Sequence, residues 1–116
     1  MKVLVCGSRK WNDRNAISKV IEHLVPGTQV IAGDATGADY IAIELTENRI
    51  DLPEPKEFKA DWDSYGLAAG PRRNIEMLED KPDIVYAFPD NNSKGTWHTV
   101  REARKRGIKT VVYGEE

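Results

Sequence analysis

Short apolar runs recur along the chain and alternate with segments in which apolar residues follow helical spacing. Runs of this kind, rich in β-branched residues, are typical of strands buried on both faces of a sheet. They cover residues 2–6, 28–32, 83–88 and 109–113. Residues 56–60 form a fifth, weaker run, whose alternating polar character predicts an edge strand.

The first two predicted helices lie between the strands of the N-terminal half. One follows the N-cap pair Asn12-Asp13 and ends at Pro26-Gly27. The other carries an apolar stripe that begins at Ala38 and reaches Leu45 at intervals of three and four residues.

Two more helices are predicted in the C-terminal half. One has Pro71 in its first turn and directs Ile75 and Leu78 inward. The other covers residues 95–107. Residues 61–70, which are rich in small side chains, are predicted to form a loop.

The strict alternation of strands and helices predicts the fold class. Short links between them favour a parallel sheet covered on both faces, because each crossover must pass over a face. We therefore expect an α/β fold: a single Rossmann-like three-layer domain over residues 1–116 with a mainly parallel five-stranded sheet. Right-handed crossovers place every strand-to-helix loop at the carboxyl edge, where such sheets bind ligands.

The composition adds that the domain lacks a basic excess. The 116 residues are 40% apolar and 31% charged, and 17 Lys and Arg against 19 Asp and Glu leave a net charge of -2. Proteins that bind duplex nucleic acid usually carry a strong basic excess, so the charge argues against a nucleic-acid partner. The apolar run at the N-terminus is too short for a signal peptide or membrane span. We expect no membrane partner and a cytoplasmic location.

Cysteine and histidine are scarce. Cys6 is the only cysteine, which excludes an intramolecular disulfide, and its strand position predicts a buried small residue rather than a nucleophile. His23 and His98 are far apart in the sequence, so we expect no metal site and no cofactor. A surface position is expected for His98, although it follows a loop at the ligand-binding edge.

Four segments at the predicted carboxyl edge are rich in glycine and small hydroxyl residues. They are residues 7–9, 33–39, 61–74 and 93–96. Glycine lets a ligand approach the backbone, and a helix N-terminus offers free N–H groups and partial positive charge to an anion. A tight turn explains any one of these loops, but four on one edge favour a phosphate-binding pocket. They match neither the G-x-G-x-x-G fingerprint nor a P-loop, so hydride transfer with NAD and P-loop hydrolysis of nucleotides are not supported.

Arg9, Arg72 and Arg73 are the candidate partners of a phosphate. A guanidinium binds phosphate through paired hydrogen bonds, each worth about 1.5–3 kcal/mol because the groups are charged. Arg72 and Arg73 are neighbours at a helix start, where successive side chains point about 100° apart. One of the two is therefore expected to face the ligand while the other packs or pairs elsewhere.

Several other residues of these loops have candidate roles. Trp62 either stacks on a nucleobase or packs against the helix layer. Asp39 either caps its helix or binds a ribose hydroxyl. The hydroxyls of Ser93 and Thr96 are expected to donate to the same anion as the helix N-terminus.

Five motifs follow one another along nearly the whole chain. They are Gly7-Ser8-Arg9 with Trp11, Gly33 with residues 36–39, Phe58 with residues 60–62, residues 69–74, and Ser93 with Gly95-Thr96. This ordered set resembles the SLOG superfamily, specifically its YspA/YpsA-related branch. The resemblance implies a Rossmann-like fold that binds nucleotide-derived ligands. With the loop analysis, it places in the pocket Gly7, Ser8, Arg9, Gly33, Thr36, Gly37, Ala38, Asp39, Trp62, Gly70, Arg72, Arg73, Asn74, Ser93, Gly95 and Thr96.

The superfamily includes phosphoribohydrolases, DNA-processing proteins of the DprA type and sensor domains for NAD-derived signals. The LOG-type hydrolases carry P-G-G-x-G-T-x-x-E, whose glutamate assists cleavage of the N-glycosidic bond. Here the residue three positions after Thr96 is Thr99, and Glu102 lies one helical turn later. This departure favours binding over hydrolysis, and no catalytic residue is assigned.

Three functions follow from these observations, in order of preference. The first is the binding or sensing of a phosphate-bearing, nucleotide-derived small molecule such as an ADP-ribose or NAD derivative or a nucleoside monophosphate. The alternative is an N-glycosidase of the phosphoribohydrolase type, with Glu76 or Asp39 assisting departure of the base. The second alternative is a DprA-like nucleic-acid-binding module. A homodimer is compatible with the sequence, but no apolar stripe specifies one.

Overall fold

The computed structural model describes residues 1–113, and the last three residues of the predicted 1–116 domain lie outside the described range. One sheet contains β1 (Lys2–Gly7), β2 (Gln29–Gly33), β3 (Lys56–Phe58), β4 (Ile84–Phe88) and β5 (Lys109–Val112) in the order β3-β2-β1-β4-β5. All the strand pairs formed by these residues are parallel. The predicted α/β class is confirmed, and β3 lies at an edge of the sheet as expected.

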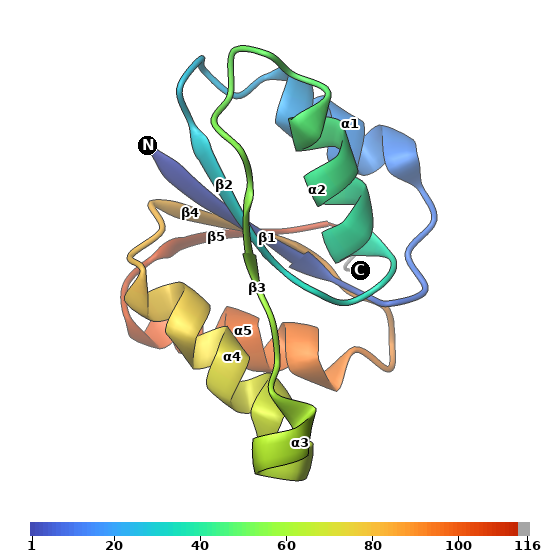
Figure 1. Ribbon diagram of the computed structural model, residues 1–116, viewed down its shortest axis with the longest axis vertical. Helices are drawn as coiled ribbons and strands as arrows, with labels where there is room; N and C mark the ends of the chain where they lie inside the picture. Colours follow the sequence, from blue (N-terminus) through green and yellow to red (C-terminus); the bar gives the residue numbers. More distant parts are fainter. Residues whose placement is uncertain (114–116) are drawn as a thin grey trace.

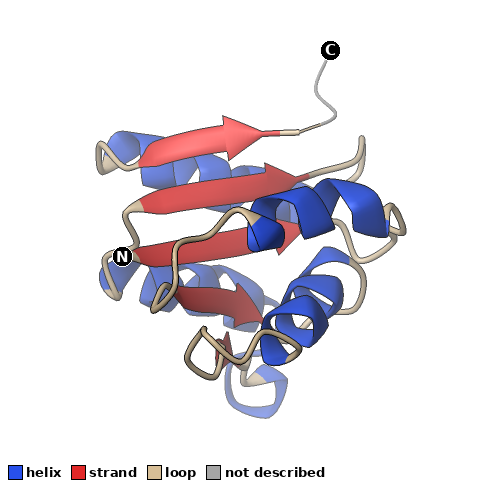
Figure 2. Ribbon diagram, turned by 90° about the horizontal axis from the view of Figure 1, so that it is seen from above, coloured by secondary structure: helices blue, strands red, loops and turns tan. Residues whose placement is uncertain are grey.

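Helices cover both faces of the sheet and give three layers (Figures 1 and 2). The pair α1 and α2 packs on one face, and the pair α4 and α5 on the other. Within residues 1–113, no helix is long and apolar enough to cross a membrane. The helices are α1 (Arg14–Glu22), α2 (Ala38–Glu47), α3 (Trp62–Tyr65), the 3₁₀ turn η1 (Gly66–Ala68), α4 (Ala69–Glu79) and α5 (Lys94–Lys105).

The central strand β1 contributes to both hydrophobic cores. Val3 and Val5 pack in the core under α1 and α2, whereas Leu4 and Cys6 pack in the core under α4 and α5. Because successive residues of a strand point to opposite faces, a strand covered on both sides must be apolar at every position. This accounts for the unbroken apolar run that identified β1.

The loop predicted for residues 61–70 is wrong. The Asp61 carboxylate accepts a hydrogen bond from the Ser64 backbone N–H at 3.1 Å and caps the short helix α3. The 3₁₀ turn follows, and α4 already begins at Ala69, so Pro71 lies in its first turn as expected. Asp61, an N-cap aspartate, indicates the start of this helix, but the small residues that follow it favoured the prediction of a loop.

The inward face of α4 also differs from the prediction. Leu78 is buried as expected, but Ile75 is only half-buried, and Met77 takes the second apolar position in the core. Arg73 and Asn74 share this buried face. Polar residues at inward positions interrupt the apolar period, so hydrophobic spacing alone could not orient this helix.

Candidate functional site

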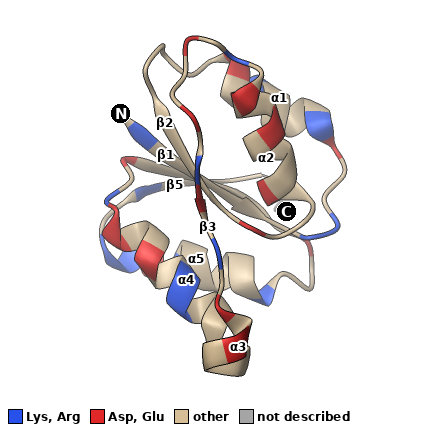
Figure 3. Cartoon of the chain, viewed as in Figure 1, with Lys and Arg blue, Asp and Glu red and all other residues tan. Residues whose placement is uncertain are grey.

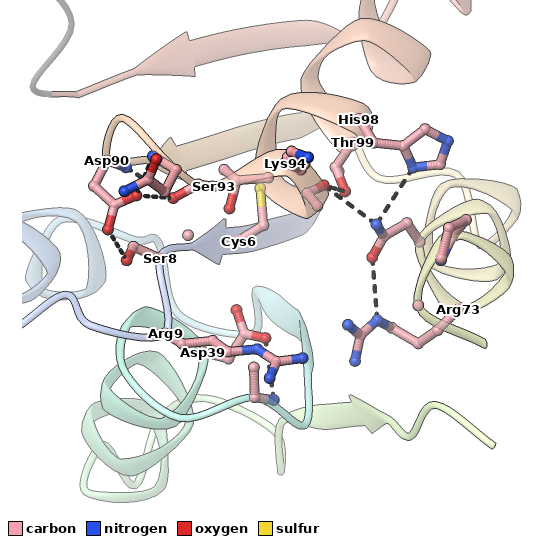
Figure 4. Close-up of a pocket in the computed structure, with 18 of the residues that line it drawn as sticks. Cys6, Ser8, Arg9, Asp39, Arg73, Asp90, Ser93, Lys94, His98 and Thr99 are labelled. Carbon is pink, nitrogen blue, oxygen red and sulfur yellow. Dashed lines mark hydrogen bonds between the residues drawn. The ribbon is translucent and has the colours of Figure 1, made fainter. Parts of the chain in front are cut away.

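A cavity of about 750 Å³ opens at the carboxyl edge of the sheet. The loops that follow β1, β2 and β4 line it, together with α3, one side of α4 and the first two turns of α5 (Figure 4). Consecutive crossovers leave opposite sides of β1, which is the place where open parallel sheets bind ligands. The volume lies within the range of about 300–1,000 Å³ that small-molecule sites occupy.

Asp90 connects the two loops on one side of the cavity. Its carboxylate accepts hydrogen bonds from the Ser8 hydroxyl at 2.5 Å and from the Ser93 hydroxyl at 2.8 Å. These hydrogen bonds hold the pKa of Asp90 below its usual range, and the bond from Ser8 has the largest effect. The hydroxyl proton of Ser93 is thus directed to Asp90 in this structure, and its donation to an anion stays a prediction.

The N-terminus of α5 forms the adjacent wall. Ser93 is its N-cap residue but makes no side-chain capping bond. The first N–H groups of a helix have no acceptor within the helix and carry partial positive charge. Gly95 and Thr96 lie in this first turn and line the cavity, and Thr96 is 6% exposed. This wall is therefore suited to an anion.

Arg73 lies opposite this wall, with its guanidinium directed toward the cavity (Figure 4). Its Nη1 donates to Asp34 at 2.7 Å and its Nε donates to the side-chain oxygen of Asn74 at 3.1 Å. Asn74 in turn donates to the carbonyl oxygen of Gly95 at 3.2 Å, which links α4 to α5. Within residues 1–113, Nη2 of Arg73 makes no hydrogen bond, so the guanidinium retains donors for a ligand.

Asp39 is a buried carboxylate on the same wall as Arg9. It is 5% exposed, and its Oδ2 accepts a long hydrogen bond of 3.4 Å from the Ala35 backbone N–H. Among the described residues, no donor reaches its Oδ1. Burial raises the pKa of Asp39 to about 7, although Arg73, Ala35 and Arg9 all act in the opposite direction. The site thus contains an acid that titrates near neutrality.

Trp62 and Leu67 stand at the mouth of the cavity. Trp62 is 44% exposed, and the Arg9 guanidinium lies 6.0 Å from the centre of its ring. Leu67 is 93% exposed and also lines the opening. The partly exposed indole lines the cavity, and its stacking on a nucleobase stays a prediction.

Most of the predicted site residues do meet at this cavity. Arg73 and not Arg72 faces it; the Arg72 guanidinium instead lies over the Tyr65 ring, 3.9 Å from the ring centre. The prediction that one of the two arginines would point elsewhere agrees with this geometry. The predicted residues in the lining are Gly7, Ser8, Arg9, Asp39, Trp62, Gly70, Arg73, Asn74, Ser93, Gly95 and Thr96.

Four predicted residues of the β2–α2 segment support the cavity without lining it. Gly33 lies directly behind the site, because a Cβ atom there would come within 2.7 Å of Arg73 Nη1. Gly37 has φ +74°, and a Cβ atom would collide with the carbonyl oxygens of Ser8 and Arg9. The Thr36 hydroxyl donates a hydrogen bond to the Arg9 carbonyl oxygen, and the Ala38 backbone N–H donates one to that of Ser8. This segment therefore holds the loop after β1 in place.

Some lining residues were not identified from the sequence. His98, for which a surface position was expected, lines the cavity, and its Nδ1 lies 3.4 Å from the Asn74 amide nitrogen. Asp90 lies two residues after the end of β4, a position that could have identified it. The others face the cavity through packing that has no local signal. These further residues are Cys6, Lys10, Ala35, Leu67, Pro71, Met77, Asp90, Asn92, Lys94 and Thr99.

Cys6 was expected to be a buried small residue, and no metal site was expected. Cys6 is 5% exposed, and burial together with the charge of Asp39 raises the pKa of its thiol. Such a thiol stays protonated, in keeping with a packing role. Over the described range, no group of three or more His, Cys, Asp or Glu residues is arranged to hold a metal ion.

The chain was compared with protein-family models and with solved structures. No protein-family model matches it. DNA processing protein A (DprA) from Streptococcus pneumoniae has a similar structure, with a TM-score of 0.52 and 18% identity; the likeness covers 95% of this chain and 58% of DprA. That likeness shows a shared fold, in agreement with the predicted Rossmann-like architecture.

The sequence comparison identifies a relative of the whole chain. The gene 61 protein of Mycobacterium phage D29 is 37% identical over 123 residues, an alignment that covers 99% of this chain and 98% of the phage protein. Such identity over the full length of both chains shows common descent, and the chain belongs to the family of the phage D29 gene 61 protein.

Proposed function

We propose that the cavity binds a phosphate-bearing, nucleotide-derived small molecule, such as an ADP-ribose or NAD derivative or a nucleoside monophosphate. The observation that carries this proposal is the position of Arg73. Its buried guanidinium faces the cavity opposite the N-terminus of α5, and both groups favour an anion. A phosphate between them would receive charged hydrogen bonds from one side and backbone N–H groups from the other.

The charge of the lining supports the same proposal. Arg9, Lys10, Arg73 and Lys94 are basic, whereas Asp39 and Asp90 are acidic. The whole chain carries a net charge of -2, so the cavity is more basic than its surroundings. Walls of one predominant sign concentrate the oppositely charged ligand.

The mouth of the cavity supports a nucleotide rather than inorganic phosphate. Trp62 provides a partly exposed aromatic ring at the cavity mouth, with the Arg9 guanidinium over it. Stacking of a base on such a face contributes about 1–3 kcal/mol and tolerates any base. Phosphate at the α5 wall and base at Trp62 would leave the sugar between them.

The DprA-like fold supports membership of the SLOG superfamily, and the ordered motifs are the basis for proposing its YspA/YpsA-related branch. In this reading the protein binds its ligand without the hydrolysis of the LOG-type enzymes. Thr99 donates to the Gly95 carbonyl oxygen where those enzymes have glutamate. Glu102 pairs with Arg106 at 2.7 Å, and neither it nor Glu76 lines the cavity. Binding therefore ranks before turnover.

A thermal-unfolding panel tests the proposed function. Adenosine 5′-monophosphate, NAD and ADP-ribose are added separately to the purified protein, with inorganic phosphate and free adenosine as controls. A bound ligand raises the melting temperature in a saturable way, because it stabilises only the folded state. We expect a larger rise with a nucleotide than with phosphate or adenosine alone. No shift with any nucleotide at millimolar concentration would contradict the proposal.

Binding of single-stranded nucleic acid is the second candidate, because DprA, a solved structure similar to this chain, is a DNA processing protein. Charged residues of both signs are interspersed over the two helix layers (Figure 3). On α5, Lys105 and Arg106 both pair with Glu102. Fluorescence anisotropy with a labelled oligonucleotide distinguishes the candidates: tight binding that weakens steeply with salt favours nucleic acid, and no binding at low salt removes it.

A further inference from the structure

The phosphate site leaves one buried polar atom of the cavity unexplained. Asp39 is 5% exposed, and its Oδ1 has no hydrogen-bond donor among residues 1–113. The large majority of buried side-chain polar atoms in proteins have a hydrogen-bond partner, and a buried carboxylate oxygen without one is costly. Because Asp39 lines the cavity, a bound ligand is the natural source of the missing donor.

The neighbouring cationic side chains do not supply that donor. Arg73 directs Nη1 to Asp34 and Nε to Asn74. Arg9 extends past Asp39 (Figure 4), and its guanidinium lies over the ring of Trp62. Asp39 forms no ion pair within 4 Å in the described part of the chain. It is therefore close to positive charge and yet free to accept a hydrogen bond.

The surroundings restrict the chemistry of the donor. A metal ion would need further ligands, but residues 1–113 contain no cluster of three His, Cys, Asp or Glu that could hold one. A cationic amine would be repelled by Arg73 and Arg9, whose charges both act on Asp39. A neutral donor, a hydroxyl or an N–H group, meets neither obstacle.

The position of Asp39 selects the hydroxyl. It shares a wall with Arg9, whose guanidinium faces Trp62, and it lies across the cavity from Ser93, Lys94 and Thr99 (Figure 4). With phosphate at the α5 wall and base at Trp62, as the proposed function has it, the sugar of a nucleotide passes Asp39. We infer that the Asp39 carboxylate accepts a hydrogen bond from a sugar hydroxyl, so that the cavity selects ribonucleotides over dideoxynucleotides.

The inference rests on the proposed function and is tested by isothermal titration calorimetry with paired ligands. The four ribonucleoside 5′-monophosphates are compared with their 2′,3′-dideoxy counterparts at pH 8, where Asp39 is mainly ionised. Sites built to bind a hydroxyl strongly reject analogues that lack it, and we expect the dideoxy ligands to bind at least about tenfold more weakly. This comparison uses the wild-type protein and does not depend on the folding of a variant.

Two variants attribute the discrimination to its residue. In Asp39→Ala, affinity for the ribonucleotide should fall to that for the dideoxynucleotide, whereas Glu79→Gln, an exposed residue on α4 outside the cavity lining, should keep the difference. Equal affinity of wild-type protein for both ligands overturns the inference and leaves the proposed function standing. Binding by none of the eight ligands also overturns it, and the thermal-unfolding panel with ADP-ribose and NAD then decides whether the proposed function falls as well.

Discussion

Arg73→Met is expected to weaken the binding of a nucleoside 5′-monophosphate by about 100-fold or more. Methionine replaces the aliphatic stem of arginine but removes the guanidinium, so the phosphate loses charged hydrogen bonds worth about 1.5–3 kcal/mol each. Asp34 and Asn74 also lose their bonds to this side chain, and the free energy of unfolding should fall by about 1–3 kcal/mol. Calorimetric titration measures the affinity, and urea unfolding measures the stability.

Arg72→Met provides a matched control for this prediction. It makes the same chemical change at the adjacent position of α4, but Arg72 is exposed and its guanidinium lies over Tyr65 outside the cavity lining. We expect this variant to bind the nucleotide with nearly unchanged affinity. If both variants lost affinity equally, the effect would come from overall charge, and the role assigned to Arg73 would be wrong.

Asp39→Asn is expected to stabilise the protein at pH 8 and to change its stability little at pH 4. Burial raises the pKa of Asp39 from 3.8 to about 7. Between pH 4 and pH 7, Asp39 is therefore protonated in the folded state but ionised in the unfolded state. The contribution of Asp39 to stability is therefore complete below pH 4 and is lost as the pH rises toward 7. With about 1.4 kcal/mol for each pKa unit, the gain from asparagine at pH 8 is up to about 4 kcal/mol.

Urea unfolding of the wild-type protein and Asp39→Asn between pH 4 and pH 9 measures this effect. The difference in the free energy of unfolding should grow with pH and level off above pH 7. Glu79→Gln, at an exposed position of α4, serves as the control for removal of one negative charge. A difference that is constant with pH, or one that grows toward acid, would contradict the burial of an ionised Asp39.

Asp39 shows how function and stability are opposed at this site. A neutral side chain in its place would avoid the burial of a charge, yet the carboxylate lies where a ligand hydroxyl would pass. Natural proteins retain such destabilising groups where the site needs them. The stability gain expected in Asp39→Asn and the loss of sugar discrimination expected in Asp39→Ala would thus be two consequences of one buried group.

The sheet could be predicted from the sequence because its signal is local. The buried strands β1, β2 and β4 are unbroken apolar runs, and β3 is polar because it lies at an edge. Parallel pairing then follows from the helices between strands. The segment that became α3 and η1 could not be recognised in the same way, since a helix of one turn has no apolar period to detect.

The candidate site was predictable at the level of loops but not of individual side chains. Glycine and hydroxyl residues after strands identified the edge, yet the choice between Arg72 and Arg73 depends on how α4 rotates against α5. His98 reaches the cavity from the second turn of α5, a position set by packing of the whole helix. The unpaired oxygen of Asp39 has no sequence signal, because it is defined by donors that are absent around it.

A crystal structure of the protein soaked with adenosine 5′-monophosphate or with ADP-ribose tests the central claim most directly. The account predicts density for a phosphate between the guanidinium of Arg73 and the backbone N–H groups of Gly95 and Thr96. The sugar should lie beside Asp39, and the base should lie against Trp62. An empty cavity with both ligands at millimolar concentration, or a phosphate bound away from Arg73 and α5, would contradict it.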